Sequence, residues 1–99
     1  MRNQIIALKN LGRMPDESLE NIPINLVEQY EQLLASIEDP ISSEEAKELI
    51  KLFPEHGLFG LEWTLLHLIE STPNWPIEEL ISLNPSKEWR QIMVSRSKK

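Results

Sequence analysis

Hydrophobic residues are densest between residues 58 and 71, and their spacing there follows one face of a helix. Leu61, Leu65 and Leu68 recur at four- and three-residue intervals, the spacing of neighbours on one side of an α-helix. Trp63 widens this apolar face until little of the helix can meet water. We therefore expect residues 58–71 to form one buried central helix, with the other helices of a small domain packed around it.

The first part of the chain predicts two more helices. Residues 2–11 carry hydrophobic side chains on one side, and Gly12 is placed to end that helix in the left-handed region. Residues 23–37 are the clearest amphipathic segment, with apolar residues on one face and glutamates and glutamines on the other. Pro23 suits a first helical turn, and the residue before Pro40 is driven out of the helical region, which ends the segment.

A further helix is expected to begin at Ser42. Glu45 follows three residues later, so the two side chains can form a capping box, in which each accepts a backbone N–H of the other residue. Pro54 ends this helix. The short Pro-Glu-His-Gly link that follows would hold the helix antiparallel to the central one, and the pair would form a helical hairpin. Gly60 is expected inside the central helix, where it would permit close approach of a neighbour.

Prolines divide the last third of the chain. Residues 72–76 are expected to form a rigid corner with Trp75 folded over the end of the core. A short helix is expected from 76 to 83, and a last helix after Asn84-Pro85, with residues 95–99 as a frayed tail.

No segment alternates apolar and polar residues with the period of a strand. The sequence therefore predicts an all-α fold in a single helical domain of residues 1–99. We expect a compact bundle of about five to six short helices, in which antiparallel helical hairpins surround the central helix 58–71.

The chain contains no cysteine. This excludes a disulfide framework, thiol catalysis and thiolate metal sites, and it suits the reducing cytosol. No uninterrupted apolar run approaches the roughly 20 residues that span a bilayer. The apolar patch near the start is too short and too interrupted for a signal peptide. We therefore expect a cytoplasmic protein with no membrane partner.

The net charge of −6 is unevenly distributed. Residues 16–48 carry ten carboxylates and one lysine, whereas residues 87–99 carry five basic side chains and one glutamate. An acidic body repels nucleic acid and attracts basic partners, although such charge can also serve solubility alone. The basic residues at the end are expected to complement the dipole of the last helix rather than to bind nucleic acid.

His67 and Glu70 are the candidate catalytic pair. Trp63, His67 and Glu70 follow one another at helical spacing, so they share one side of the central helix. Glu70 could orient the imidazole for proton transfer or for a ligand, or it could satisfy a partly buried histidine. No residues show metal-ligand spacing, and no nucleophile has a partnered base or a glycine elbow. We expect a protein that is not an enzyme and needs no cofactor or metal.

The central stretch carries a family resemblance. Residues 60–71 read Gly-Leu-Glu-Trp-Thr-Leu-Leu-His-Leu-Ile-Glu-Ser, and Trp75, Asn84-Pro85 and Trp89 follow. This pattern resembles small helical immunity proteins that are encoded beside bacterial polymorphic toxins, including those of contact-dependent inhibition systems. The resemblance covers roughly residues 45–95. It implies a protein that binds a toxin domain and blocks its active site, but it carries over no binding residues.

Three hypotheses follow. The first is a non-catalytic immunity protein whose acidic surface binds a basic toxin domain. The second is a helical adapter or subunit domain that binds a partner through an apolar groove near Trp75 and Trp89. The third is an enzyme that uses His67 and Glu70. The first assigns partner binding to the carboxylates of the acidic region, namely Asp16, Glu17, Glu20, Glu28, Glu31, Glu38, Asp39, Glu44, Glu45 and Glu48.

Overall fold

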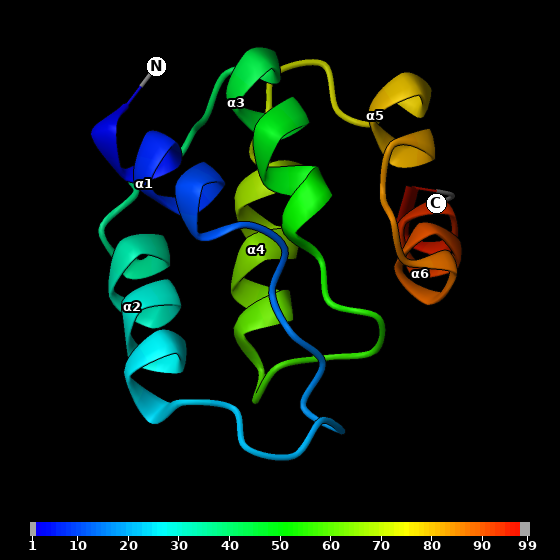
Figure 1. Cartoon of the computed structure of the whole chain (residues 1–99). Helices are drawn as coiled ribbons and strands as arrows, with labels where there is room; N and C mark the ends of the chain where they lie inside the picture. Colours follow the sequence, from blue (N-terminus) through cyan, green and yellow to red (C-terminus); the bar gives the residue numbers. More distant parts are fainter. Residues whose placement is uncertain (1, 98–99) are drawn as a thin grey trace.

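The computed structural model describes residues 2–97, which form α-helices joined by short connections and contain no strand (Figure 1). The all-α prediction of five to six short helices in a compact bundle is confirmed. The elements in chain order are α1 (Asn3–Leu11), α2 (Ile24–Ala35), α3 (Ser43–Leu49), the 3-10 helix η1 (Ile50–Leu52), α4 (Leu61–Glu70), α5 (Glu78–Ser82) and α6 (Lys87–Ser97).

Helices α1 to α4 pack together, and α5 and α6 form a second pair at their side (Figure 1). α1 packs against α2 and α3, and both α2 and α3 contact α4. α3 and α4 lie side by side and run in opposite directions (Figure 1), which confirms the predicted helical hairpin. The central position expected for residues 58–71 therefore belongs to α4.

Only part of α4 is buried. Leu65, Leu66 and Ile69 are fully buried against the neighbouring helices, and this burial is the main apolar contribution of α4 to the core. Trp63, in contrast, is 44% exposed, and His67 is exposed as well. The expectation that little of this helix meets water is wrong, because the neighbouring helices cover its leucine side and leave the opposite side open.

α4 begins at Leu61 rather than at residue 58. Gly60 precedes the helix with φ of 89°, a left-handed conformation that glycine adopts without strain. No atom lies within 4 Å of the position that a Cβ of Gly60 would occupy. The expected role of Gly60 as a site of close helix approach is therefore wrong.

The other predicted helix ends agree with the structure in most places. Ser42 and Glu45 form the expected capping box, in which Glu45 N donates to Ser42 Oγ at 3.1 Å and Ser42 N donates to Glu45 Oε1 at 3.0 Å. Gly12 ends α1 with a positive φ of 83°. α6 continues through Ser97, so residues 95–97 do not fray, and residues 98–99 of the expected tail lie outside the described residues.

Candidate partner-binding surfaces

Asp16 is held within the fold by hydrogen bonds. It is only 8% exposed. Its Oδ1 accepts from the backbone N–H groups of His56 at 2.7 Å and Gly57 at 3.1 Å, and its Oδ2 accepts from both the hydroxyl and the backbone N–H of Ser18. The hydroxyl of Ser18, followed by these backbone donors, holds the pKa of Asp16 well below its usual range despite burial. Asp16 thus has little exposed surface to offer a partner, and its assignment to partner binding stays a prediction.

Glu45 is also buried and bonded within the chain. It is 6% exposed, and its Oε2 lies 3.2 Å from Nε of Arg2. Burial raises the pKa of Glu45, but the hydrogen bonds from Ser42 and the charge of Arg2 together outweigh burial, so the pKa lies below its usual value. This carboxylate caps α3 and pairs with Arg2, which leaves it little surface to offer a partner. Its assignment to partner binding stays a prediction.

Glu48 lies close to two lysine side chains. Its Oε2 lies 3.7 Å from Nζ of Lys9, and its Oε1 lies 3.9 Å from Nζ of Lys51. Two nearby ammonium groups weaken the field that this carboxylate can offer to a partner. Glu48 therefore contributes less to an acidic surface than its position in the sequence suggests.

The remaining seven candidate carboxylates are exposed, and none forms an ion pair with another residue in the range 2–97. The sequence has no lysine, arginine or histidine between Arg13 and Lys47, so α2 and its flanking connections carry negative charge only. We call these seven residues the α2 acidic strip: Glu28 and Glu31 lie on α2, Glu44 lies in the first turn of α3, and the other four lie in the connections that flank α2, namely Glu17, Glu20, Glu38 and Asp39.

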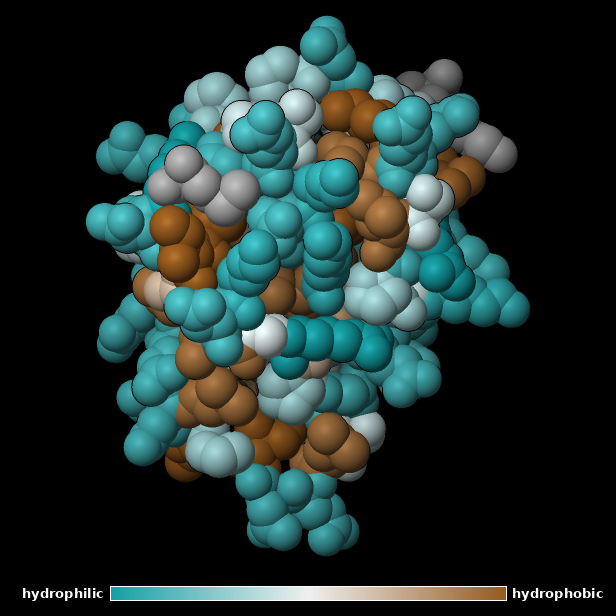
Figure 2. Space-filling view, turned by 45° about the horizontal axis from the view of Figure 1, so that its top comes forward, coloured by the Kyte–Doolittle hydropathy of each residue, from teal (hydrophilic) through white to brown (hydrophobic). Residues whose placement is uncertain are grey.

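Six of the seven members of the strip lie on α2 or in the connections at its two ends. Glu17 and Glu20 lie in the connection that enters α2 at the lower end in Figure 1, and Glu38 and Asp39 lie in the connection that leaves it at the upper end. In a view turned by 45° from that of Figure 1, hydrophilic residues cover much of the visible face and hydrophobic residues lie in several patches between them (Figure 2).

The predicted pair of His67 and Glu70 does not form. Both oxygens of Glu70 accept hydrogen bonds from Arg96, each at 2.8 Å. The exposed side chain of His67 instead lines a shallow groove between α2 and α4 together with Asp39 and Thr64. Within residues 2–97, Glu70 is therefore bonded to Arg96 and does not orient the imidazole of His67 as predicted.

Trp89 cannot line an open groove. It is 2% exposed and stacks on Phe53 with ring centroids 5.3 Å apart, while Trp63 meets it edge-on at 5.1 Å. The indole Nε1 of Trp89 donates to the carbonyl oxygen of His56 at 2.8 Å. Trp75 is half-buried against the same core. The expected groove near Trp75 and Trp89 is therefore not open at Trp89, which joins α6 to the rest of the core.

Two exposed aromatic side chains were not expected at the surface. Phe59 is 64% exposed and Trp63 is 44% exposed, whereas the periodic pattern assigned both to a buried helix. The only sequence signal for their position is the pair Gly57 and Gly60, because glycines on both sides of a residue are typical of a turn.

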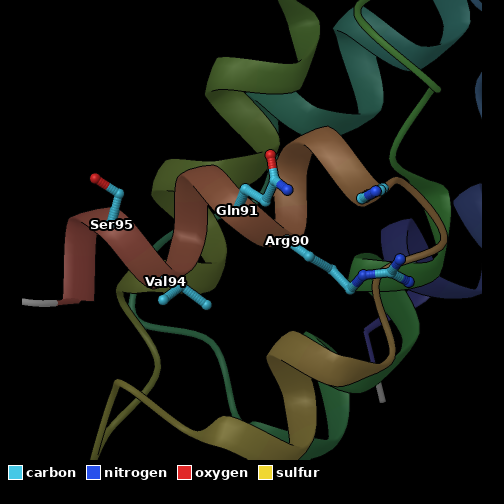
Figure 3. A pocket seen from close by; sticks show the side chains of 5 residues that line it. Arg90, Gln91, Val94 and Ser95 are labelled. Atoms are coloured by element: carbon cyan, nitrogen blue, oxygen red, sulfur yellow. The ribbon is translucent and has the colours of Figure 1, made fainter.

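A basic pocket of about 540 Å³ lies along α6. In Figure 3, Arg90 points toward the connection between α5 and α6, and Val94 points toward α5. Nη1 of Arg90 donates to the carbonyl oxygen of Asn84 at 2.9 Å, so this guanidinium helps to hold the connection. Arg96 is engaged by Glu70. Two of the five basic residues near the chain end, Arg90 and Arg96, therefore have structural roles, and Lys98 and Lys99 lie outside the described residues.

Comparisons with known proteins assign no family. A scan of protein-family models, a search of curated proteins and a search of solved structures each found no match for this chain. Among residues 2–97, no group of three or more histidine, aspartate or glutamate side chains could hold a metal ion. None of the helices in that range is both long enough and apolar enough to cross a membrane.

Proposed function

We propose that this chain is a non-catalytic protein-binding domain and, specifically, an immunity protein that neutralises a bacterial toxin domain in the cytoplasm. The observation that carries the proposal is the α2 acidic strip, whose seven exposed carboxylates have no ion-pair partner within residues 2–97. Charge left unneutralised over the length of one helix is available to an external basic surface. The resemblance of residues 45–95 to toxin-associated immunity proteins agrees with this use.

The physical role of the strip is attraction. Toxins that cleave nucleic acid are basic where they bind phosphate, so an acidic inhibitor can associate quickly and compete with the nucleic acid for the same surface. Such an inhibitor needs a complementary surface and performs no reaction. This accounts for a site made of separate carboxylates with no paired imidazole.

The proposal is tested with a toxin domain encoded beside the gene. We expect a large secreted protein with a variable C-terminal domain to be encoded directly upstream. Co-expression of that domain with this chain should restore growth, and the purified pair should form a stoichiometric complex. The matched control is an unrelated helical protein of similar net charge, which should not protect. Toxicity that persists despite full expression of this chain would rule the proposal out.

A helical adapter is the second candidate, and the exposed side chains of Phe59 and Trp63 favour it. An adapter that docks through apolar contacts should associate at a rate that changes little with salt. Electrostatic attraction predicts a steep fall, because the Debye length shortens from about 10 Å at 0.1 M to about 3 Å at 1 M. Association rates of the complex measured across this range therefore separate the two candidates.

A further inference from the structure

Phe59 holds an unusual backbone conformation while its side chain faces water. Its φ is +51°, in the left-handed region that bulky residues rarely occupy. The two other non-glycine residues with positive φ within 2–97 are Asn21 and Asn74, and asparagine tolerates this region well. Phe59 gains no compensating burial, since it remains 64% exposed. Strain of this kind persists only where the surroundings impose it, and it often marks a functional site.

Two buried carboxylates impose the conformation. Oδ1 of Asp16 accepts from the backbone N–H groups of His56 and Gly57. Oε1 of Glu62, a residue only 4% exposed, accepts from the N–H groups of Leu58 at 2.7 Å and Gly60 at 3.1 Å. The backbone donors on both sides of Phe59 are thus bonded to carboxylates, which fixes the turn. An aromatic side chain on a fixed backbone loses little freedom on binding.

Trp63 lies in the first turn of α4, four residues after Phe59. Its ring meets Trp89 edge-on with centroids 5.1 Å apart, and Trp89 is itself stacked on buried Phe53. The core therefore supports one side of the Trp63 ring while 44% of the residue remains exposed. Aromatic residues supported in this way are typical of the few positions that dominate interface affinity.

Carboxylates surround this aromatic turn, which we define as residues 56–63. Glu17 is bonded through its backbone N–H to the carbonyl oxygen of Gly57 at 2.8 Å, and its side chain lies beside that glycine. Glu55 is exposed in the same connection, and half-exposed Glu88 lies 3.5 Å from the imidazole of His56. Negative charge around an apolar centre complements a partner whose contact surface is apolar at its middle and basic at its edge.

We infer that Phe59 and Trp63 form the apolar anchor through which this chain holds a basic protein partner. The inference rests on the proposed function, because it takes that partner to be the toxin domain. The α2 acidic strip accelerates association, and the anchor slows dissociation. The backbone conformation that the two carboxylates fix at Phe59 then keeps a large hydrophobic side chain on the surface, where a partner can bind it.

The variant Phe59→Asn separates function from folding. Asparagine suits a positive φ, so the variant should be at least as stable to heat as the wild type. Its complex with the toxin domain should dissociate about tenfold faster or more, with an association rate that is nearly unchanged. The control is Leu83→Asn, which alters a 40% exposed hydrophobic residue outside the turn and should leave dissociation unchanged.

The possible results are distinguishable. A wild-type chain that binds no toxin domain refutes the proposed function together with the anchor. A wild-type complex that dissociates as slowly with Phe59→Asn as without it refutes the anchor and leaves the immunity function standing. A lower melting temperature for Phe59→Asn would contradict the claim that phenylalanine is held there at a cost in stability.

Discussion

The α2 acidic strip and the aromatic turn use carboxylates in opposite ways. On the strip, residues such as Glu28 and Glu31 are exposed and make no ion pair with any residue from 2 to 97. At the turn, Asp16 and Glu62 are buried and accept hydrogen bonds from four backbone N–H groups. The first use projects a long-range field, and the second builds a rigid surface for short-range contact. Burial and hydrogen bonding, rather than the number of acidic residues, therefore separate carboxylates that attract from those that support.

The largest expected effect is on folding stability. Asp16→Ala leaves the backbone N–H groups of His56 and Gly57 without acceptors, so the free energy of unfolding should fall by about 3 kcal/mol. Glu20→Ala, a change on the neighbouring strip, should alter it by less than about 0.5 kcal/mol. Urea denaturation of both variants measures the difference. Equal losses of unfolding free energy in the two variants would contradict the distinction between buried carboxylates that stabilise the fold and exposed carboxylates on the strip.

Acid should remove the stabilisation that Asp16 provides. The pKa of Asp16 is lowered in the folded state, so its contribution to stability is complete above its unfolded-state pKa of about 3.9 and is lost as the pH falls toward the lower folded-state pKa. The variant Asp16→Asn should be less stable at pH 7, yet its stability should fall less between pH 5 and acid. Thermal unfolding of the wild type and Asp16→Asn across that pH range tests this prediction. Melting temperatures that fall in parallel for the two proteins would contradict it.

A smaller effect is expected at the capping box of α3. Ser42→Ala removes the acceptor for the N–H of Glu45 and should cost about 1 kcal/mol of unfolding free energy. Ser43→Ala, one residue later and exposed, is the matched control and should be nearly neutral. A larger loss for Ser43→Ala than for Ser42→Ala would contradict the capping role of Ser42.

Local features of the fold were readable from the sequence, and long-range ones were not. The capping box and the end of α1 at Gly12 depend on residues within a few positions of one another, and the helices of the α3–α4 hairpin are consecutive α-helices separated only by residues 50–60. Asp16 accepts hydrogen bonds from residues about 40 positions away, so no local sequence pattern predicts its burial.

The aromatic turn was not predicted from the sequence for a different physical reason. Its residues fit the hydrophobic period of the helix that follows, and Glu62 looks like an ordinary solvent-facing glutamate. In the structure, Glu62 turns back to bind Leu58 and Gly60, which delays the start of α4 and leaves Phe59 exposed. Periodicity identifies the helix and its apolar side but not the hydrogen bonds that decide where the helix begins.

The most direct test of the central claim compares charge reversal on and off the strip. Glu28→Lys/Glu31→Lys and Glu78→Lys/Glu79→Lys change the net charge equally, but only the first pair lies on α2. At low salt, we predict that the α2 pair lowers the rate of association with the toxin domain about tenfold and flattens its salt dependence, while the α5 pair has a much smaller effect. Equal association rates for the two double variants would contradict the claim that the α2 acidic strip attracts the partner.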